Sequence, residues 1–425
     1  MTPEPLDHEQ RNKRVLAGQS VVSKMAWTLG SPSIVLPFLA ISLEMPMFLA
    51  GLLIAVRKVG GMLCDVFLAD TIAAMGHKKN LVAVTELALA SCLMVAVAAA
   101  AFGSVTMIAV AFVCVFFCFG FTEETQSLLF TDLIGDYLSS KSRMQLSYLQ
   151  LGAGGLGAIA LTLVLHELTK QNPPFSRHTV VIVASVVFFL LSGFLILRLT
   201  EFAGSAKQDR VQGNSPGRIL SSFVSDARQL YQENWFRTYL LMRLPLVVVA
   251  LSVPFFALIT AEAHHGSASG LTALIVSSAA GFLISAPLWR MVNMKSHRAV
   301  MISGTLMVAV SGSALIALHF LGLDHIVHLH GAALLVATIA ATGISNARKL
   351  YFWDVAPKEQ RVKSSAVIKS LSRLTAVITA TSLAAFAHVS SISASVLVIV
   401  VVSLISAYIC FRLVPPAHTQ EAHAS

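Results

Sequence analysis

Two adjacent glutamates, Glu123 and Glu124, interrupt a long apolar run that begins near Met107. An ionised carboxylate inside hydrocarbon is costly, so each one must face a protein interior, a water-filled cavity or a cationic partner. Because neighbouring residues on a helix point about 100° apart, the two carboxylates cannot occupy the same site. The pair therefore predicts a polar pathway inside a helical membrane protein.

Basic residues occur at a comparable depth in the first two apolar segments, where Lys24, Arg57 and Lys58 lie. An ion pair between Lys24 or Arg57 and Glu123 or Glu124 would lower the cost of burying both charges. Such a network would bind substrate or a proton, or it would only lock helices together. The sequence leaves both alternatives open.

The second half of the chain places Arg243, Lys369 and Arg373 in the apolar segments 237–261 and 364–388. No acidic residue accompanies them in these segments, so this half of the pathway is predicted to be net positive. Its guanidinium groups, Arg373 above all, would then bind an anionic group of a substrate. Alternatively, the charged ends of Arg243 and Lys369 reach toward the membrane surface.

A third set of residues lies near the ends of apolar segments and in the short loops between them. These residues are candidates for a gate or a loop clamp, or they are solvated charges at the membrane interface. Lys78, Lys79 and Arg143 are the expected partners of the aspartates in the first half. The full set comprises Asp65, Asp70, Gly76, Lys78, Lys79, Asp136, Arg143, Asp354 and Arg361.

Histidines gather in two loops that are predicted to face the outside. They are His264 and His265 in one loop, and His325 and His328 in the other. Because nitrogen ligands suit transition-metal ions, these side chains form a candidate metal-collecting site at the outer mouth of the pathway. The alternative is that they are ordinary interfacial histidines.

The composition excludes most soluble classes. Apolar residues make up 56% of the chain and charged residues 12%, whereas soluble chains usually carry about a quarter charged residues. The net charge of +9 comes from basic residues in short gaps between apolar runs, where they set topology, so no nucleic acid is expected. No nucleophile–base grouping or phosphate-binding loop suggests an enzyme, and no cofactor is predicted. The expected partners are the lipid bilayer and a small-molecule or ion substrate, with a monomer as the transport unit.

Twelve apolar segments are each long enough to cross the roughly 30 Å hydrocarbon core as a helix. A polar, turn-rich stretch separates the first six from the last six. The predicted organisation is an N-terminal tail at 1–14, a six-helix bundle at 15–199, a linker at 200–236, a second six-helix bundle at 237–413 and a C-terminal tail at 414–425.

Lysine and arginine are concentrated in alternate loops. This bias predicts that both tails and the linker are cytoplasmic. The expected location is the bacterial cytoplasmic (inner) membrane, or an intracellular membrane derived from it.

An internal repeat supports the division into two halves. Residue pairs of the first half recur in the second at an almost constant offset, which predicts two parallel six-helix units with a substrate path between them. The recurring pairs are Met25 and Pro37, found again 217 residues later as Met242 and Pro254, and Asp136 and Arg143, found again 218 residues later as Asp354 and Arg361.

With these features the chain resembles the major facilitator superfamily of transporters over essentially its whole length. The loop from Asp70 to Lys79 resembles the acidic–glycine–basic signature of the family, although Asp70 and Gly76 stand further apart than usual. The stretch from Asp354 to Arg361 resembles the equivalent loop of the second half. The resemblance implies an all-α membrane protein with twelve transmembrane helices in two pseudo-symmetric bundles. It also implies secondary active transport by alternating access, often driven by a proton or ion gradient.

The substrate alternatives are a small organic anion and a metal cation. The basic second half favours the anion, whereas the outer histidines and paired glutamates favour the metal. In the second case the chain would be similar to iron permeases of the same superfamily, including those of magnetosome membranes. A transporter-like sensor or assembly scaffold is the alternative from another functional class.

Overall fold

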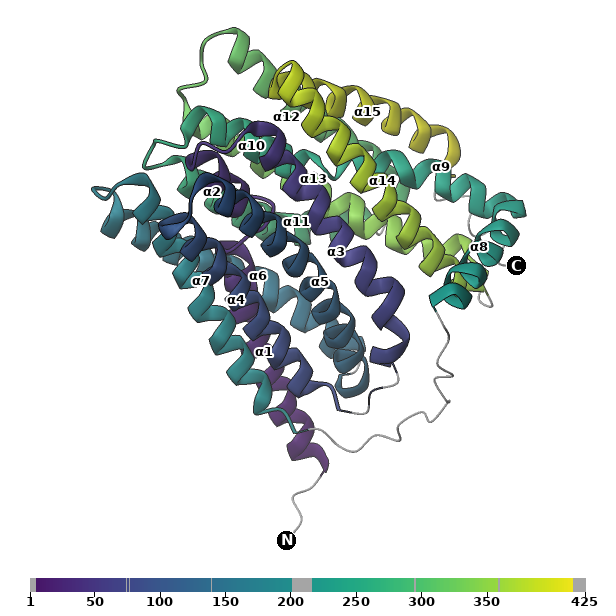
Figure 1. Ribbon diagram of the computed structural model, residues 1–425. Helices are drawn as coiled ribbons and strands as arrows, with labels where there is room; N and C mark the ends of the chain where they lie inside the picture. Colours follow the sequence, from purple (N-terminus) through teal and green to yellow (C-terminus); the bar gives the residue numbers. More distant parts are fainter. Residues whose placement is uncertain are drawn as a thin grey trace.

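The computed structural model describes residues 5–73, 75, 77–138, 140–200, 216–293, 296–357 and 360–415. In these residues the regular elements are fifteen α-helices without a strand (Figure 1). The first half contains α1 (Pro5–Leu29), α2 (Val35–Ser42), α3 (Met47–Ala73), α4 (Lys79–Phe102), α5 (Val105–Tyr137), α6 (Ser140–Thr169) and α7 (Pro174–Leu197). The second half contains α9 (Asn234–Val249), α10 (Ser252–His264), α11 (Gly270–Asn293), α12 (His297–Phe320), α13 (Val327–Val355), α14 (Arg361–Val389) and α15 (Ile392–Leu413). Between the halves, α8 (Pro216–Gln232) lies in the predicted linker.

The predicted all-helical membrane fold is confirmed. Eleven stretches are long and apolar enough to cross a membrane, and one of them combines α9 and α10. The remaining predicted span, 15–42, is divided between α1 and α2. The chain bends there at Gly30 and Pro32, because proline cannot continue the hydrogen-bond ladder of a helix.

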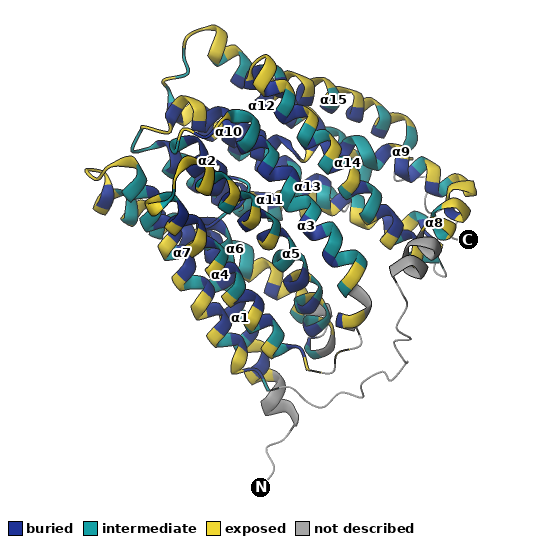
Figure 2. Cartoon of the chain, in the orientation of Figure 1, coloured by how far each residue is buried: buried dark blue, intermediate teal, exposed yellow. Residues whose placement is uncertain are grey.

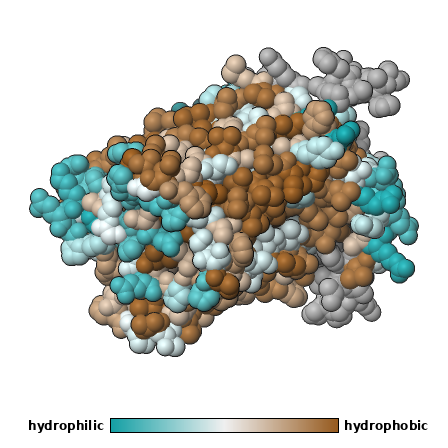
Figure 3. All heavy atoms as spheres, turned by 90° about the horizontal axis from the view of Figure 1, so that it is seen from above, coloured by the Kyte–Doolittle hydropathy of each residue, from teal (hydrophilic) through white to brown (hydrophobic). Residues whose placement is uncertain are grey.

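Apolar side chains face outward as well as inward. Figure 3 shows them in the middle of the visible face, with hydrophilic residues toward its two sides. Large apolar residues such as Phe102, Val105 and Leu168 are well exposed, although the helices bury one large and one smaller apolar cluster (Figure 2). A surface of this kind is suited to hydrocarbon, since lipid tails solvate apolar side chains.

The two halves meet mainly along three helix pairs, α3 with α14, α6 with α11, and α2 with α10, and smaller contacts such as that of α1 with α11 lie beside them. Several polar and aromatic contacts join them at the end of the molecule where α2 and α10 lie. Arg177 donates a hydrogen bond to the Gly266 carbonyl over 3.2 Å, and His166 lies 3.1 Å from the Thr272 hydroxyl. The halves are therefore closed against each other at this end, which we call the α2–α10 end.

Inside the first half, α3 and α5 approach so closely that their backbones touch. A Cβ on Gly60 would lie 2.2 Å from the Phe117 carbonyl oxygen, and a Cβ on Gly120 would lie 2.0 Å from that of Arg57. Small residues allow such approach between membrane helices. This contact brings the charged side chains of α3 next to those of α5.

We expect Gly60→Ala to destabilise the protein by about 2 kcal/mol, because the added methyl group forces two backbones apart. The midpoint of thermal unfolding of the purified protein would measure this. Gly18→Ala is the matched control, since its Cβ would meet no atom within 4 Å. Equal midpoints for the two variants would show that the close approach of α3 and α5 does not contribute to stability.

The repeated loop arginines have the same role in both halves. Arg143 donates from Nε to the carbonyl of Leu138 and from Nη2 to that of Gly135, over 2.7 and 3.1 Å. Arg361 repeats the pattern on Ala356 and Trp353, over 3.1 and 2.7 Å. Each arginine thus binds carbonyl groups that the end of the preceding helix leaves free.

Candidate functional site

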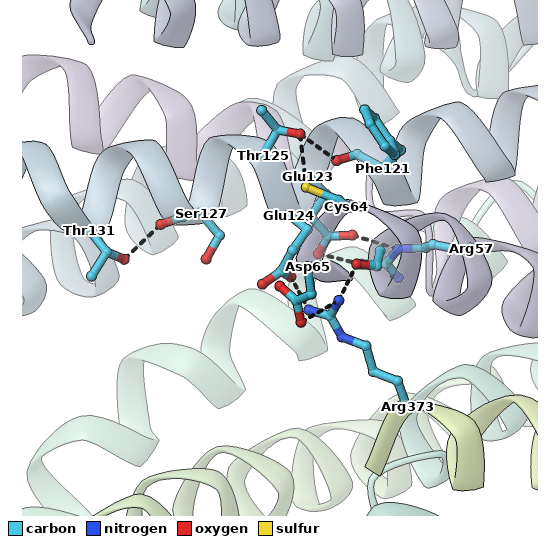
Figure 4. A network of polar contacts seen from close by, with 11 residues as sticks. Arg57, Cys64, Asp65, Phe121, Glu123, Glu124, Thr125, Ser127, Thr131 and Arg373 are labelled. Atoms are coloured by element: carbon cyan, nitrogen blue, oxygen red, sulfur yellow. Dashed lines mark hydrogen bonds and ion pairs between the residues drawn. The ribbon is translucent and has the colours of Figure 1, made fainter. Parts of the chain in front are cut away.

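The predicted ion pair between α3 and α5 forms with Arg57 and Glu123. Arg57 donates from Nε and Nη2 to the two carboxylate oxygens of Glu123, each over 2.7 Å (Figure 4). Its third nitrogen, Nη1, donates to the Ser33 hydroxyl over 2.8 Å. A bidentate pair of this kind fixes both side chains in direction as well as in distance.

Beside this pair, Arg373 of α14 crosses from the second half to the first. Its Nη1 lies 2.7 Å from Asp65 Oδ2, and its Nη2 lies 2.6 Å from Glu124 Oε2 (Figure 4). Nη1 also donates to the carbonyl oxygen of Gly61. All three charged side chains are at least four-fifths buried in the protein. The contact therefore joins the two halves through a buried charge network.

This network changes two expectations from the sequence. Asp65 was expected to pair with a loop cation, but it lies about two helical turns above the end of α3 and faces α14. Arg373 was expected to leave its half of the pathway net positive, but carboxylates of the first half neutralise it. With half-buried Lys58 included, three cations balance three carboxylates here.

Lys24 was the alternative to Arg57 as the partner of a glutamate, and the structure places it elsewhere. Its ammonium nitrogen lies 3.4 Å from the ring centroid of Phe282 in α11, a cation–π contact between the halves. Gly154 makes room for it, since a Cβ there would lie 2.7 Å from the Lys24 Cβ. Among the described residues Lys24 forms no ion pair.

Two cavities adjoin these charged residues. The first, of about 230 Å³, lies between α1, α5 and α6 and includes Glu123 in its wall. The second, of about 300 Å³, lies between the halves and includes Lys24, Arg57 and Phe282. Trp27 and Gln150 line both. The remaining wall is rich in serine, threonine and glutamine, so a polar solute of modest size would find hydrogen-bond partners there.

Sequence reasoning missed Glu86, which is fully buried in α4. One of its carboxylate oxygens, Oε1, accepts hydrogen bonds from Gln19, Ser23 and Ser192, over 3.1, 3.2 and 2.6 Å. The other, Oε2, has no hydrogen-bond partner among the described residues. A lone acidic residue inside an apolar segment, about two turns from the start of α4, was the available signal. Gln19 and Ser23 also line the first cavity and thus connect it to Glu86.

The predicted gate residues are dispersed. Lys78 forms an ion pair with Asp132 at the end opposite α2 and α10, and Lys79 donates to the Leu199 carbonyl over 2.9 Å. Asp354 lies 3.2 Å from His297. Gly76 and the side chains of Asp70 and Asp136 lie outside the described residues.

The four predicted metal ligands are not brought together. Among the described residues, no group of three or more His, Cys, Asp or Glu is arranged to hold a metal ion. His264 is buried and packs edge-on against His330, with ring centroids 4.9 Å apart. His265 and His325 approach backbone carbonyl groups, and His328 is exposed.

Comparison with known proteins identifies the fold. A structure of the nucleoside transporter NupG is 12% identical, with a TM-score of 0.70, and the match covers 95% of this chain and 100% of that one. The inward open structure of the xylose transporter XylE from E. coli is 14% identical, with a TM-score of 0.70 over 96% and 99% of the two chains. No protein-family model matches the sequence.

Proteins that are similar in sequence occur in mycobacteria. Uncharacterized proteins of Mycobacterium tuberculosis and Mycobacterium bovis are 24% identical over 387 residues, which is 90% of this chain and 73% of each relative. The structural likenesses show that the chain has the fold of the major facilitator superfamily. Both solved neighbours are transporters.

Proposed function

We propose that the chain is a secondary active transporter that moves a small organic anion by alternating access, driven by a proton or ion gradient. The fold supports this proposal, because its two halves enclose a polar cavity and are closed against each other at the α2–α10 end. Alternating access requires such a state and a second state in which this end is open. The solved neighbours carry a nucleoside and xylose, which are also small organic solutes.

The membrane orientation belongs to the same proposal. Lysine and arginine are concentrated in the loops at the end opposite α2 and α10, which favours a cytoplasmic location for that end and for both termini. The α2–α10 end then faces outward, and the closed contact there describes an inward-facing state. The likeness to the inward open structure of XylE agrees with this assignment.

The observation that carries the choice of substrate is the position of Lys24. It lines the cavity between the halves with no ion pair among the described residues, whereas Arg57 and Arg373 are already neutralised. An anionic group would gain an unopposed charge there. Glu123 lines the neighbouring cavity and is about one-third exposed, so it is the candidate to exchange a proton with the pathway. A metal substrate lacks a comparable ligand group in the described residues.

Uptake into proteoliposomes tests the proposal. We expect accumulation of at least one member of a panel of small organic anions, dependent on an imposed proton or sodium gradient. Lys24→Met should reduce the initial rate at least tenfold, because the charge that attracts the anion is lost. Glu123→Gln should abolish the dependence on the gradient while leaving exchange of substrate across the membrane.

The matched control is Lys170→Met, which removes an exposed lysine that pairs with Glu167 at the end of α6. It should retain wild-type rates. Uptake of divalent iron or manganese in place of the anions would favour the metal alternative. No uptake of any solute by well-folded protein would contradict transport and favour a sensor or scaffold.

A further inference from the structure

Four cationic residues of the second half lie together on α9, α13 and α14. They are Arg243, Arg348, Lys349 and Lys369, and their charges repel one another. Tyr239 links two of them, because its hydroxyl accepts from Arg243 Nη1 over 3.2 Å and donates to the Arg348 carbonyl over 3.0 Å. We call these four residues the cationic cluster.

The cationic cluster lies next to the contact that Arg373 makes with the first half. Arg243 donates from Nε to the hydroxyl of Ser372 over 2.8 Å, and Ser372 precedes Arg373 in α14. Lys369 lies one helical turn before Arg373 and so shares the face of α14 that meets α3. Arg243 lies nine residues after the start of α9, so it is roughly 13 Å along the helix from that end.

The cationic cluster lacks negative charge. Glu124 and Asp65 are already bound to Arg373, and none of the four cations forms an ion pair among the described residues. Arg348 is the extreme case, since its Nε is buried without a hydrogen-bond partner in the described part of the chain. A buried guanidinium in this condition is costly unless an anion binds to it.

We propose that the cationic cluster is a second binding site, besides the cavity at Lys24, for a multiply charged anionic group, a phosphate or a dicarboxylate, of the solute that the protein moves. The inference rests on the proposed transport function and names the substrate class. Arg243 and Arg348 supply planar donor groups that match phosphate and carboxylate oxygens, and Lys349 and Lys369 supply additional charge. The Arg373 contact lies between this site and the closed α2–α10 end.

A phosphate-bearing ligand could also be a lipid headgroup, which shares the same chemistry. The position of Lys369, on the face of α14 that meets the first half, favours a solute in the pathway over a lipid on the outer surface. The experiment therefore contains separate arms for the two sources.

The test uses the full chain in nanodiscs of zwitterionic lipid. Inorganic phosphate and succinate are added at constant ionic strength against chloride, and binding is followed by the shift of the thermal midpoint. We expect one of these anions to raise the midpoint, since a ligand of the native state stabilises it. Arg348→Gln and Lys349→Gln should each weaken apparent affinity about tenfold, the loss expected for a charge-assisted hydrogen bond.

The control is Arg298→Gln. Arg298 is also a cation of the second half, but it does not belong to the cationic cluster and stacks on Phe411, with its guanidinium carbon 4.4 Å from the ring centroid. It should leave anion affinity unchanged. The same weakening in Arg298→Gln, or no shift beyond that of chloride, would overturn the proposal. So would stabilisation by anionic phosphatidylglycerol in the nanodisc that depends on Arg348 while soluble anions have no effect.

Failure of this inference is separable from failure of the transport function. Anion uptake that is unaffected by Arg348→Gln and Lys349→Gln would overturn the site and leave transport standing. Binding that depends on Arg348 in a protein without any uptake would support the site and contradict transport.

Discussion

Arg373→Met is expected to lower the free energy of unfolding by about 3–5 kcal/mol, the largest loss we expect from any single charge in this chain. The substitution leaves Asp65 and Glu124 buried, close together and without the guanidinium that binds both. Thermal unfolding of the purified protein in detergent measures the loss. Because the contact crosses between the halves, their association should weaken at the same time.

A combined variant separates charge from packing. Asp65→Asn with Glu124→Gln in the Arg373→Met background removes all three charges and should recover most of the lost stability. Lys363→Met is the surface control, because Lys363 is mostly exposed and lies 3.5 Å from Asp226. Such a pair contributes little, so its loss should change the midpoint only slightly. An Arg373→Met variant as stable as Lys363→Met would refute the role of the network.

Transport should respond differently from stability. If Arg373 must release and regain the two carboxylates when the halves rock, the neutral combined variant will fold yet remain at least tenfold slower in uptake. Wild-type uptake by that variant would show that the network only holds the halves together. The sequence left these two roles open, and this measurement decides between them.

Most of the fold could be predicted from the sequence, because the signals for it lie along the chain and do not depend on tertiary contacts. Apolar length alone predicts the spans, and the repeat of Asp136–Arg143 as Asp354–Arg361 predicts equivalent halves. The structure adds the reason for the arginine repeat, which is that Arg143 and Arg361 each bind carbonyl groups at a helix end. The break of the first span at Gly30 and Pro32 was not predicted, although Pro32 interrupts the hydrogen-bond ladder there.

The charged site was only partly accessible. The depth of Arg57 and Glu123 along their helices predicted that they could meet, and close glycine packing between α3 and α5 makes the contact direct. Whether a side chain faces one neighbour or another depends on helix rotation, which the sequence did not determine. For that reason Lys24 stood beside Arg57 as an alternative partner of the glutamates although it packs on Phe282. Asp65 was expected to pair with a loop cation although it binds Arg373.

Glu86→Ala is the second substitution with a large expected effect. It removes the oxygen on which the donors of Gln19, Ser23 and Ser192 converge, and it leaves a cavity in α4. Unsatisfied buried donors and lost volume together should cost about 2–4 kcal/mol. The thermal midpoint of the purified variant measures the loss, and Glu167→Ala at an exposed site serves as the control.

Glu86→Gln should behave in the opposite way. Glutamine keeps a carbonyl oxygen for the three donors at nearly the same volume, and it carries no charge that would need a partner. No described cation pairs with Glu86, so removing the charge should leave the midpoint equal to that of the wild type or above it. If Glu86→Gln is instead as unstable as Glu86→Ala, the negative charge itself is needed. In that case a cation bound at Oε2 would be the physical explanation, because only an opposite charge makes a buried carboxylate more favourable than a neutral amide.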